Sequence, residues 1–368
     1  MSCIDVSRGS PCSNCVILRW HLAISGKDMT ARHPHHPQYM PIIKWQKFEQ
    51  YALLGLDEHF IGATLPCIEV RKTTQHVDLM QGLAKNWRHA ALIDYADPEG
   101  RLSSARMAEF GAFLRHAGAR AYPVTPVVDS RDMTELPDML QQALKFFQVI
   151  ALRVRVPSIG AAASVLNQAK KSLELARELS ASVRLIVDLG VTPQEWMGRD
   201  TKQLTEVLRE LQKVGPQSLH LASGAFPNSL AQVQVGEFAR RDWKLRKEIQ
   251  DGAPDLVIGY ADYGVISPEW SEDALTKRGG RVAIRYARLD DWLVLRADGK
   301  SKKHSEDLSI LMVNVYRDSF KGPRYSTGDH MIAVRADKFA AARQKKSGTY
   351  HVTEGWIHHV AVVVTEQY

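Results

Sequence analysis

The sequence has few cysteines, no long apolar run and none of the short motifs that define common enzyme classes. Its four cysteines, Cys3, Cys12, Cys15 and Cys67, are too few for a disulfide framework and predict a reducing, cytoplasmic environment. No stretch of about 18 apolar residues exists, so we expect no membrane-spanning helix. HExxH, GxSxG, Walker A and GxGxxG patterns are absent, so no reaction follows from a motif.

The composition is that of an ordinary globular protein, but the charge is uneven. Of the 368 residues, 45% are hydrophobic and 24% are charged, which is enough for a large core. The formal net charge of +7 arises at the two ends of the chain, in residues 1–38 and 281–368. Basic ends could meet nucleic acid or another anionic partner, although a solvated surface explains the same charge.

Residues 1–38 are predicted to be a disordered N-terminal extension. Prolines and histidines crowd residues 32–37, where neither a helix nor a strand would persist. The pair Cys12 and Cys15 has half of a zinc-knuckle spacing, which alone is weak support for a metal site.

Short apolar runs alternate with helical patterns between residues 39 and 264. The eight runs cover residues 39–45, 64–70, 89–95, 120–126, 148–155, 182–189, 217–223 and 255–262. Continuous apolar runs are typical of parallel strands that are covered on both faces. An open doubly wound sheet would carry a glycine-rich turn after its first strand, and none follows Trp45. The sequence therefore predicts an α/β fold, a TIM-like (β/α)8 barrel over residues 39–264.

After residue 264 the alternation stops, and residues 265–368 are predicted to form a C-terminal α+β lobe packed on the barrel. Residues 281–288 and 292–296 read as paired strands. A helix is expected over 306–316 with Ser305 as its N-cap, and a strand is expected over 355–365. On such a strand His358 and His359 would point to opposite faces.

Polar residues at the strand ends are the main functional signal, because the carboxyl ends of barrel strands line the functional mouth. We select these as candidate catalytic groups: Lys44, Glu69, Asp94, Asp188 and Asp262. Candidate ligand-binding residues are Arg153, Arg155, Tyr263, Arg285, Tyr325, Ser326, Asp329, His358 and His359.

Three chemistries remain open for these residues. The carboxylates could hold Mg²⁺ or Mn²⁺ and hydrolyse a phosphate-bearing ligand, with Lys44 and Arg153 on phosphate oxygens. A carboxylate pair could instead act on a glycoside, or Lys44 could form a Schiff base. The simpler interpretation of Lys44 is a salt bridge with Glu69, and some acids at the mouth are expected to pair with Arg153.

Two stretches near the ends of this sequence resemble the beta family of proteins, which is named after a bacteriophage beta protein. The first runs from Tyr39 to Leu54 and continues in residues 65–70; the second comprises residues 325–329, 356–359 and Gln367. This sequence has Phe48 where the family usually has a glycine before the glutamate. Lys44, Glu69, Tyr325, Ser326, Asp329, Trp356, His358 and His359 match the family, which implies one shared site with the lobe folded over the mouth.

The resemblance implies a role in bacterial conflict with phages or mobile elements, in some cases beside a restriction-type nuclease, and it implies no particular reaction. Two functions therefore stay open. One is metal-assisted hydrolysis at the mouth. The other is a non-catalytic sensor that binds a phage protein, nucleic acid or an associated nuclease. Carboxylates converging on one ion would favour the first, and carboxylates each satisfied by an arginine would favour the second.

Overall fold

The computed structural model describes residues 37–71, 73–95, 103–129, 136–179, 181–269, 281–346 and 350–367. The N-terminal extension therefore lies outside the described residues, except for Pro37 and Gln38. Contacts within the chain place residues 35–368 in one compact unit. Gln38 belongs to it, because its carbonyl oxygen lies 3.0 Å from His220 Nε2.

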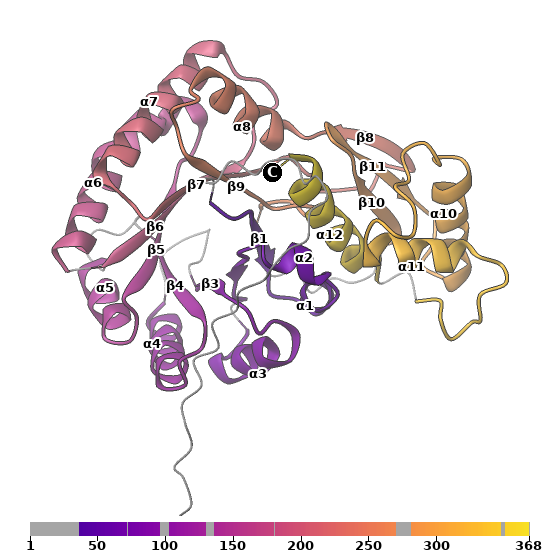
Figure 1. The fold of residues 1–368 in the computed structure, drawn as a ribbon, viewed down its shortest axis with the longest axis horizontal. Helices are drawn as coiled ribbons and strands as arrows, with labels where there is room; N and C mark the ends of the chain where they lie inside the picture. The colour runs from indigo at the N-terminus through magenta and orange to yellow at the C-terminus, as the bar shows by residue number, and fades with distance from the viewer. Residues whose placement is uncertain are drawn as a thin grey trace, which may run out of the picture. The chain divides into compact units, whose positions relative to one another are not determined.

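Eight parallel strands close into a barrel, as predicted (Figure 1). In barrel order they are β1 (Met40–Lys44), β2 (Cys67–Glu69), β3 (Ala91–Asp94), β4 (Val124–Asp129), β5 (Val149–Arg155), β6 (Ser182–Val191), β7 (Ser218–Gly224) and β9 (Ile258–Asp262). Each lies within a few residues of an expected run. Closure is direct, since Met40 and Pro41 of β1 pair with Ala261 and Asp262 of β9.

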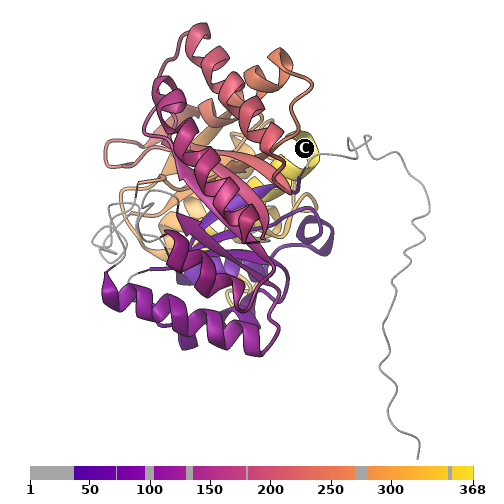
Figure 2. The ribbon, with the colours of Figure 1, turned by 90° about the vertical axis from the view of Figure 1, so that its left-hand side faces the viewer.

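Helices cover the outside of the barrel, where they bury the outward-facing strand residues (Figure 2). They are α1 (Lys47–Leu54), α2 (Glu58–Ile61), α3 (His76–Asn86), α4 (Ser104–Ala119), α5 (Leu136–Leu144), α6 (Ala162–Glu178, after a short 3₁₀ turn at Ile159–Ala161), α7 (Gly198–Val214) and α8 (Arg241–Gly252). Their apolar faces repeat every three or four residues, as in α5, where Leu136, Leu140 and Ala143 are fully buried.

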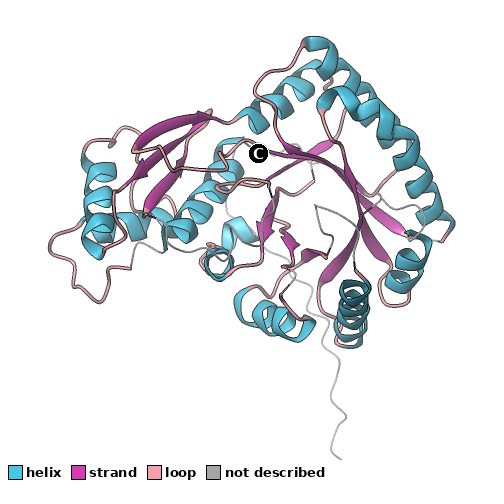
Figure 3. Cartoon of the chain, turned by 180° about the vertical axis from the view of Figure 1, so that it is seen from behind, coloured by secondary structure: helices cyan, strands magenta, loops and turns pink. Residues whose placement is uncertain are grey.

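The lobe holds a three-stranded antiparallel sheet with the order β10, β11, β8 (Figure 3). Its strands β10 (Ala283–Ala287) and β11 (Asp291–Arg296) match the predicted pair. Strand β8 (Val235–Ala239) was not predicted and comes from within the expected barrel segment, so the lobe sheet also draws on residues before 264. Helices α10 (Lys302–Asn314) and α11 (Thr327–Ala336) share a hydrophobic cluster with this sheet.

The prediction of a strand over 355–365 was wrong. Helix α12 (His351–Val362) occupies this region and continues as a π-helical turn at Val363–Gln367. Every residue from Thr353 to Val363 is buried, and a helix that is buried all round has no periodicity that separates it from a buried strand. The N-cap of α10 was also misplaced: Ser301 accepts the bond from the His304 backbone N–H, and the helix begins at Lys302.

Helix α12 lies beside α1, against the outside of the barrel (Figure 1). The Thr353 hydroxyl donates to the carbonyl oxygen of Phe48 at 2.7 Å, and the Phe48 and Tyr350 rings are 5.7 Å apart. The last helix therefore stands where the eighth barrel helix belongs. No helix of the described residues is long and apolar enough to cross a membrane.

Candidate functional site

A polar layer lies directly above an apolar layer inside the barrel. The apolar layer comprises Ile42, Cys67, Leu92, Val127, Ala151, Ile186, Ala222 and Ala261, all buried in one cluster. Because strand side chains alternate, the residue two positions further along each strand also faces inward. These residues are Lys44, Glu69, Asp94, Asp129, Arg153, Asp188, Gly224 and Tyr263. The strand ends therefore bring most of the predicted mouth residues together.

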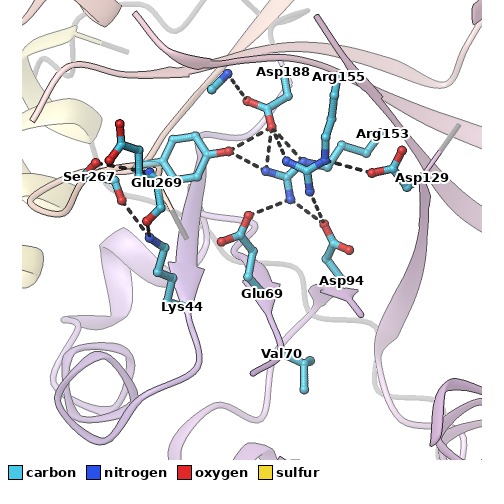
Figure 4. A network of polar contacts seen from close by, with 12 residues as sticks. Lys44, Glu69, Val70, Asp94, Asp129, Arg153, Arg155, Asp188, Ser267 and Glu269 are labelled. Atoms are coloured by element: carbon cyan, nitrogen blue, oxygen red, sulfur yellow. Dashed lines mark hydrogen bonds and ion pairs between the residues drawn. The ribbon is translucent and has the colours of Figure 1, made fainter. Parts of the chain in front are cut away.

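Arg153 lies at the centre of this layer (Figure 4). Its Nη1 contacts Glu69 Oε1 at 2.9 Å and Asp94 Oδ2, and its Nε lies 3.0 Å from Asp188 Oδ2. Its Nη2 donates to Asp188 Oδ2 at 2.7 Å and to the Tyr263 hydroxyl at 2.6 Å. No nitrogen of this fully buried guanidinium is left without a partner. We call Glu69, Asp94, Arg153, Asp188 and Tyr263 the Arg153 cluster.

The second arginine of β5 extends the cluster toward the strand ends. Arg155 Nε lies 2.8 Å from Asp129 Oδ2, and its Nη1 lies 3.2 Å from Asp188 Oδ2. Burial alone would raise the pKa of Asp188, but the charges of Arg153 and Arg155 outweigh it and lower that pKa. Arg155 Nη2 and Glu69 Oε2 are buried and form no hydrogen bond with the described residues.

Gly224 makes room for Tyr263 in the polar layer. A Cβ on Gly224 would lie 3.1 Å from the Tyr263 Cβ and 3.0 Å from its Cδ2, closer than ordinary contacts. The missing side chain lets the Tyr263 ring lie against β7. From there its hydroxyl donates to Asp188 Oδ2 at 2.9 Å.

Lys44 is held by backbone carbonyl oxygens, with Glu69 acting on it as a nearby charge. Its Nζ donates to the carbonyl oxygen of Ser267 at 2.9 Å and to that of Glu269. Burial lowers the pKa of Lys44, while the nearby charges of Glu69 and Glu49 oppose that shift. Lys44 therefore ties the segment after β9 to the end of β1.

Arg285 of the lobe approaches the mouth. Its Nη1 donates to the carbonyl oxygen of Val265, just beyond β9, at 3.1 Å, and its guanidinium lies 5.4 Å from the centre of the Phe226 ring. Burial lowers its pKa, and the charge of Glu49 opposes this. The lobe thus borders the mouth through β10.

Asp262 belongs to a different cluster, because it faces outward from β9 while its neighbour Tyr263 faces inward. Its Oδ1 accepts from the Tyr39 hydroxyl at 2.6 Å, and its Oδ2 lies 2.7 Å from His359 Nε2 and 3.7 Å from Arg240 Nη2. Behind it, the Tyr260 hydroxyl donates to Asp242 Oδ2 at 2.8 Å. The residues Tyr39, Arg240, Asp242, Tyr260, Asp262 and His359 form what we call the Asp262 cluster, which joins β1, β9 and α8 to α12.

The Asp262 cluster has strongly shifted ionisation. Burial would raise the pKa of Asp262, but His359 and Arg240 lower it. Burial lowers the pKa of His359, against the opposing charge of Asp262. Burial raises the pKa of Asp242 to about 6, although Arg240 opposes the shift.

The remaining predicted residues hold the lobe together. Asp329 of α11 accepts from the Tyr286 hydroxyl at 2.6 Å and from the Ser326 hydroxyl at 2.5 Å, and it lies 2.9 Å from His358 Nδ1. The other ring nitrogen of His358 faces the carbonyl oxygen of Ala287 at 2.8 Å. Ser326 is the N-cap of α11, so this group fastens α11 and α12 to β10.

Tyr325 bonds within the C-terminal region, where its hydroxyl donates to Glu366 Oε1 at 2.5 Å. The family-matched residues therefore divide among three places: the barrel interior, the Asp262 cluster and the lobe. They do not converge on the single shared site that we expected. The Ser326–Asp329–His358 arrangement is no catalytic triad, because His358 faces a backbone carbonyl instead of the serine.

Sequence reasoning missed Asp129, Glu49 and Tyr39. Asp129 carries the detectable signal, since it follows the inward Val127 by two positions, but the strand was predicted to end at residue 126. Glu49 is buried at the start of α1, and its position beside Lys44 depends on the fold. Tyr39 reaches Asp262 only because β1 and β9 are neighbours in the closed barrel.

The comparisons with known proteins identify a family. A family model described as Beta protein matches residues 39–365. No curated protein matches. The solved structures that match include enzymes of low similarity. A putative fructose-1,6-biphosphate aldolase from Coccidioides immitis is 12% identical with a TM-score of 0.31, over 61% of this chain and 68% of that one.

Two further structures match over more of their length. Hydroxymethylglutaryl-CoA lyase from Pseudomonas aeruginosa is 12% identical with a TM-score of 0.36, over 85% of this chain and 97% of that one. A chitinase from Chromobacterium violaceum is 11% identical with a TM-score of 0.34, over 76% and 91% of the two chains. These similarities are too low to carry an argument about activity.

Proposed function

Because the chain belongs to the Beta protein family, which fixes no reaction, we propose a function from the mouth itself: a preassembled recognition site for a small polar ligand. In this proposal the protein is a non-catalytic sensor in conflict with phages or mobile elements. In the cytoplasm it would bind a phage protein or an associated nuclease as its partner.

The observation that carries the proposal is the complete pairing of Arg153. Three carboxylates surround its guanidinium at 2.7 to 2.9 Å or closer, where a hydrolase of this kind would place its metal ion. A buried guanidinium held this way fixes the acids in position. The Arg153 cluster is therefore held in place by its own contacts, without a metal ion.

Metal-assisted hydrolysis receives no support from this arrangement. Among the described residues, no group of three or more His, Cys, Asp or Glu side chains is placed to hold a metal ion. Mg²⁺ and Mn²⁺ need carboxylate oxygens that are free to converge, and here those oxygens face Arg153. Arg153 also has no unpartnered nitrogen for a phosphate oxygen, and Asp262 faces the other side of its strand.

The chemistry of the ligand follows from the two polar atoms that have no hydrogen-bond partner among the described residues. Glu69 Oε2 offers an acceptor with negative charge, and Arg155 Nη2 offers a donor with positive charge. A buried polar atom without a hydrogen bond costs about 1–3 kcal/mol, which a ligand would recover. A compact zwitterion, such as an amino acid, complements both atoms.

Thermal unfolding of the purified full chain tests this proposal. We expect a panel of free amino acids to contain at least one that raises the melting temperature, and we expect Mn²⁺ to have no effect. The stabilisation should disappear in Glu69→Gln, which keeps an oxygen for Arg153, and persist in Glu206→Gln, an exposed carboxylate on α7. A Mn²⁺-dependent rise that Glu69→Gln removes would overturn the proposal in favour of the metal site.

The biological part of the proposal has its own test. A bacterial host that expresses the chain together with its neighbouring genes should resist some phages in a plaque assay. Resistance should be lost in Glu69→Gln and kept in Glu206→Gln. Equal resistance in both variants would separate any defence role from the barrel mouth.

A further inference from the structure

The strongest concentration of uncompensated charge lies on the lobe, away from the barrel mouth. The segments 298–303 and 337–346 contain seven cations: Lys300, Lys302, Lys303, Lys338, Arg343, Lys345 and Lys346. They contain only two carboxylates, Asp298 and Asp337, which leaves +5 of the chain's formal +7 on sixteen residues. We call these two segments the basic patch.

The two segments are neighbours in space although about 40 residues separate them. Lys302 Nζ, at the start of α10, donates to the carbonyl oxygen of Ala342 at 3.3 Å. Lys345 Nζ lies 3.9 Å from Glu306 Oε1, also on α10. The patch is therefore one surface at the amino end of α10.

Most of these cations are exposed and unpaired. Lys303 pairs with Asp307, and Lys345 approaches Glu306. The other five form no ion pair with a carboxylate of the described residues. Exposed cations without counter-charges repel one another, so gathering them favours an anionic partner with several charges.

An aromatic ring stands among the cations. Phe339 is 84% exposed, the most exposed large hydrophobic side chain in the described part of the chain. Lys338 Nζ lies 4.9 Å from the centre of its ring. An exposed aromatic ring beside cations is the pattern that binds single strands, where bases stack on rings while cations meet phosphates.

We propose that the basic patch binds single-stranded nucleic acid, with phosphates on Lys300, Arg343 and Lys346 and a base on the Phe339 ring. A duplex offers its phosphates but keeps its bases stacked inside, so Phe339 gives the single strand an advantage. This surface is separate from the barrel mouth, and neither proposal depends on the other.

Fluorescence anisotropy with a labelled oligothymidylate of about 20 nucleotides tests the proposal, with salt varied from roughly 50 to 200 mM. The patch variant is Lys300→Gln/Arg343→Gln/Lys346→Gln. Its control, Arg199→Gln/Lys213→Gln/Lys247→Gln, removes the same charge from exposed sites on α7 and α8. Each phosphate contact contributes about 0.7 to the salt slope, so the patch variant should lose about 2 and the control almost nothing.

Phe339→Ala separates stacking from charge. We expect it to weaken oligothymidylate binding about fivefold or more without changing the salt slope. A duplex of the same length should bind more weakly than the single strand and should not respond to Phe339→Ala.

Three results would overturn the proposal. One is the absence of binding even at the lowest salt, and another is an equal loss in the patch and control variants. The third is binding to vesicles containing anionic lipid that is as tight as binding to the oligonucleotide and depends on the same residues. That result would assign the patch to a membrane surface.

Discussion

The Arg153 cluster inside the barrel and the Asp262 cluster outside it contain the same kinds of residue but differ in how fully their atoms are paired. Inside, only Glu69 Oε2 lacks a hydrogen-bond partner in the described structure. Outside, Asp242 Oδ1, Arg240 Nε and His359 Nδ1 all lack one. Complete hydrogen bonding fixes the positions of charged groups, whereas burial of Asp242 in the outer cluster raises its pKa to about 6. The inner cluster is therefore suited to recognition, and the outer cluster is the pH-sensitive joint that holds α12.

Among the predictions that test the difference between the two clusters, removing Arg153 should change the free energy of unfolding most. Arg153→Met leaves Glu69, Asp94 and Asp188 buried without their common cation. We expect the free energy of unfolding to fall by about 3–5 kcal/mol, measured by urea denaturation. Because Arg153 lowers the pKa of Asp188 in the folded wild type, the stability deficit of Arg153→Met should be largest near neutral pH and should shrink as the pH falls and the buried carboxylates take up protons.

Arg153→Lys is the matched variant, since it keeps the charge with fewer donors and should lie between wild type and Arg153→Met. If the free energy of unfolding fell by less than about 1 kcal/mol in Arg153→Met, the carboxylates would be satisfied without the arginine. The inner cluster would then not depend on complete pairing with Arg153.

The pH dependence of the outer cluster should be the next largest effect. Burial raises the pKa of Asp242 from its usual 3.8 to about 6, so the folded state binds more protons than the unfolded state between these values. The wild type therefore loses stability as the pH rises through this window, by about 3 kcal/mol at 1.36 kcal/mol per pKa unit. Asp242→Asn cannot ionise and still accepts from the Tyr260 hydroxyl.

Urea denaturation of both proteins at several pH values from about 4 to 7 measures this difference. The stability of Asp242→Asn relative to the wild type should grow as the pH rises. Parallel pH profiles would contradict the assignment of the pH-sensitive joint to Asp242.

The smallest of these effects should come from His359. His359→Leu removes one partner of Asp262, which keeps the Tyr39 hydroxyl, the Gly264 backbone N–H at 3.1 Å and Arg240. We expect a loss of about 1–2 kcal/mol in thermal or urea unfolding, partly restored in His359→Gln, whose amide can donate to Asp262. A loss as large as that of Arg153→Met would mean that the two clusters are equally dependent on single partners.

The local signals that predicted the fold differ in strength. The eight barrel strands were found because each is a continuous apolar run, buried on both faces. Strand β8 has a glycine at Gly236 and alternates between exposed and half-buried residues, so it gave no such run. Helix α12 was mistaken for a strand because burial on all sides removes the helical period.

The sequence predicted which residues belong to the candidate site, but it did not predict all of the contacts between them. Lys44, Glu69, Asp94, Arg153 and Asp188 were identified at strand ends and do share the barrel interior. Pairing of Arg153 with acids of the mouth was expected from the strand ends, and Glu69 and Asp94 do pair with it. That Asp188 joins them on the same guanidinium, and that Asp262 leaves the group, could not be derived from strand ends alone. Adjacent residues on a strand face opposite sides, and only the closure of the barrel decides which side is inside.

The sequence by itself determined the barrel, because the order and spacing of buried runs are local properties of the chain. It also determined the excess of positive charge in the lobe, which is a matter of composition. The tertiary structure alone decided which acids meet which bases. The polar contacts of the two clusters join residues from 18 to 223 positions apart, and the register of the closed sheet and the docking of α12 set them.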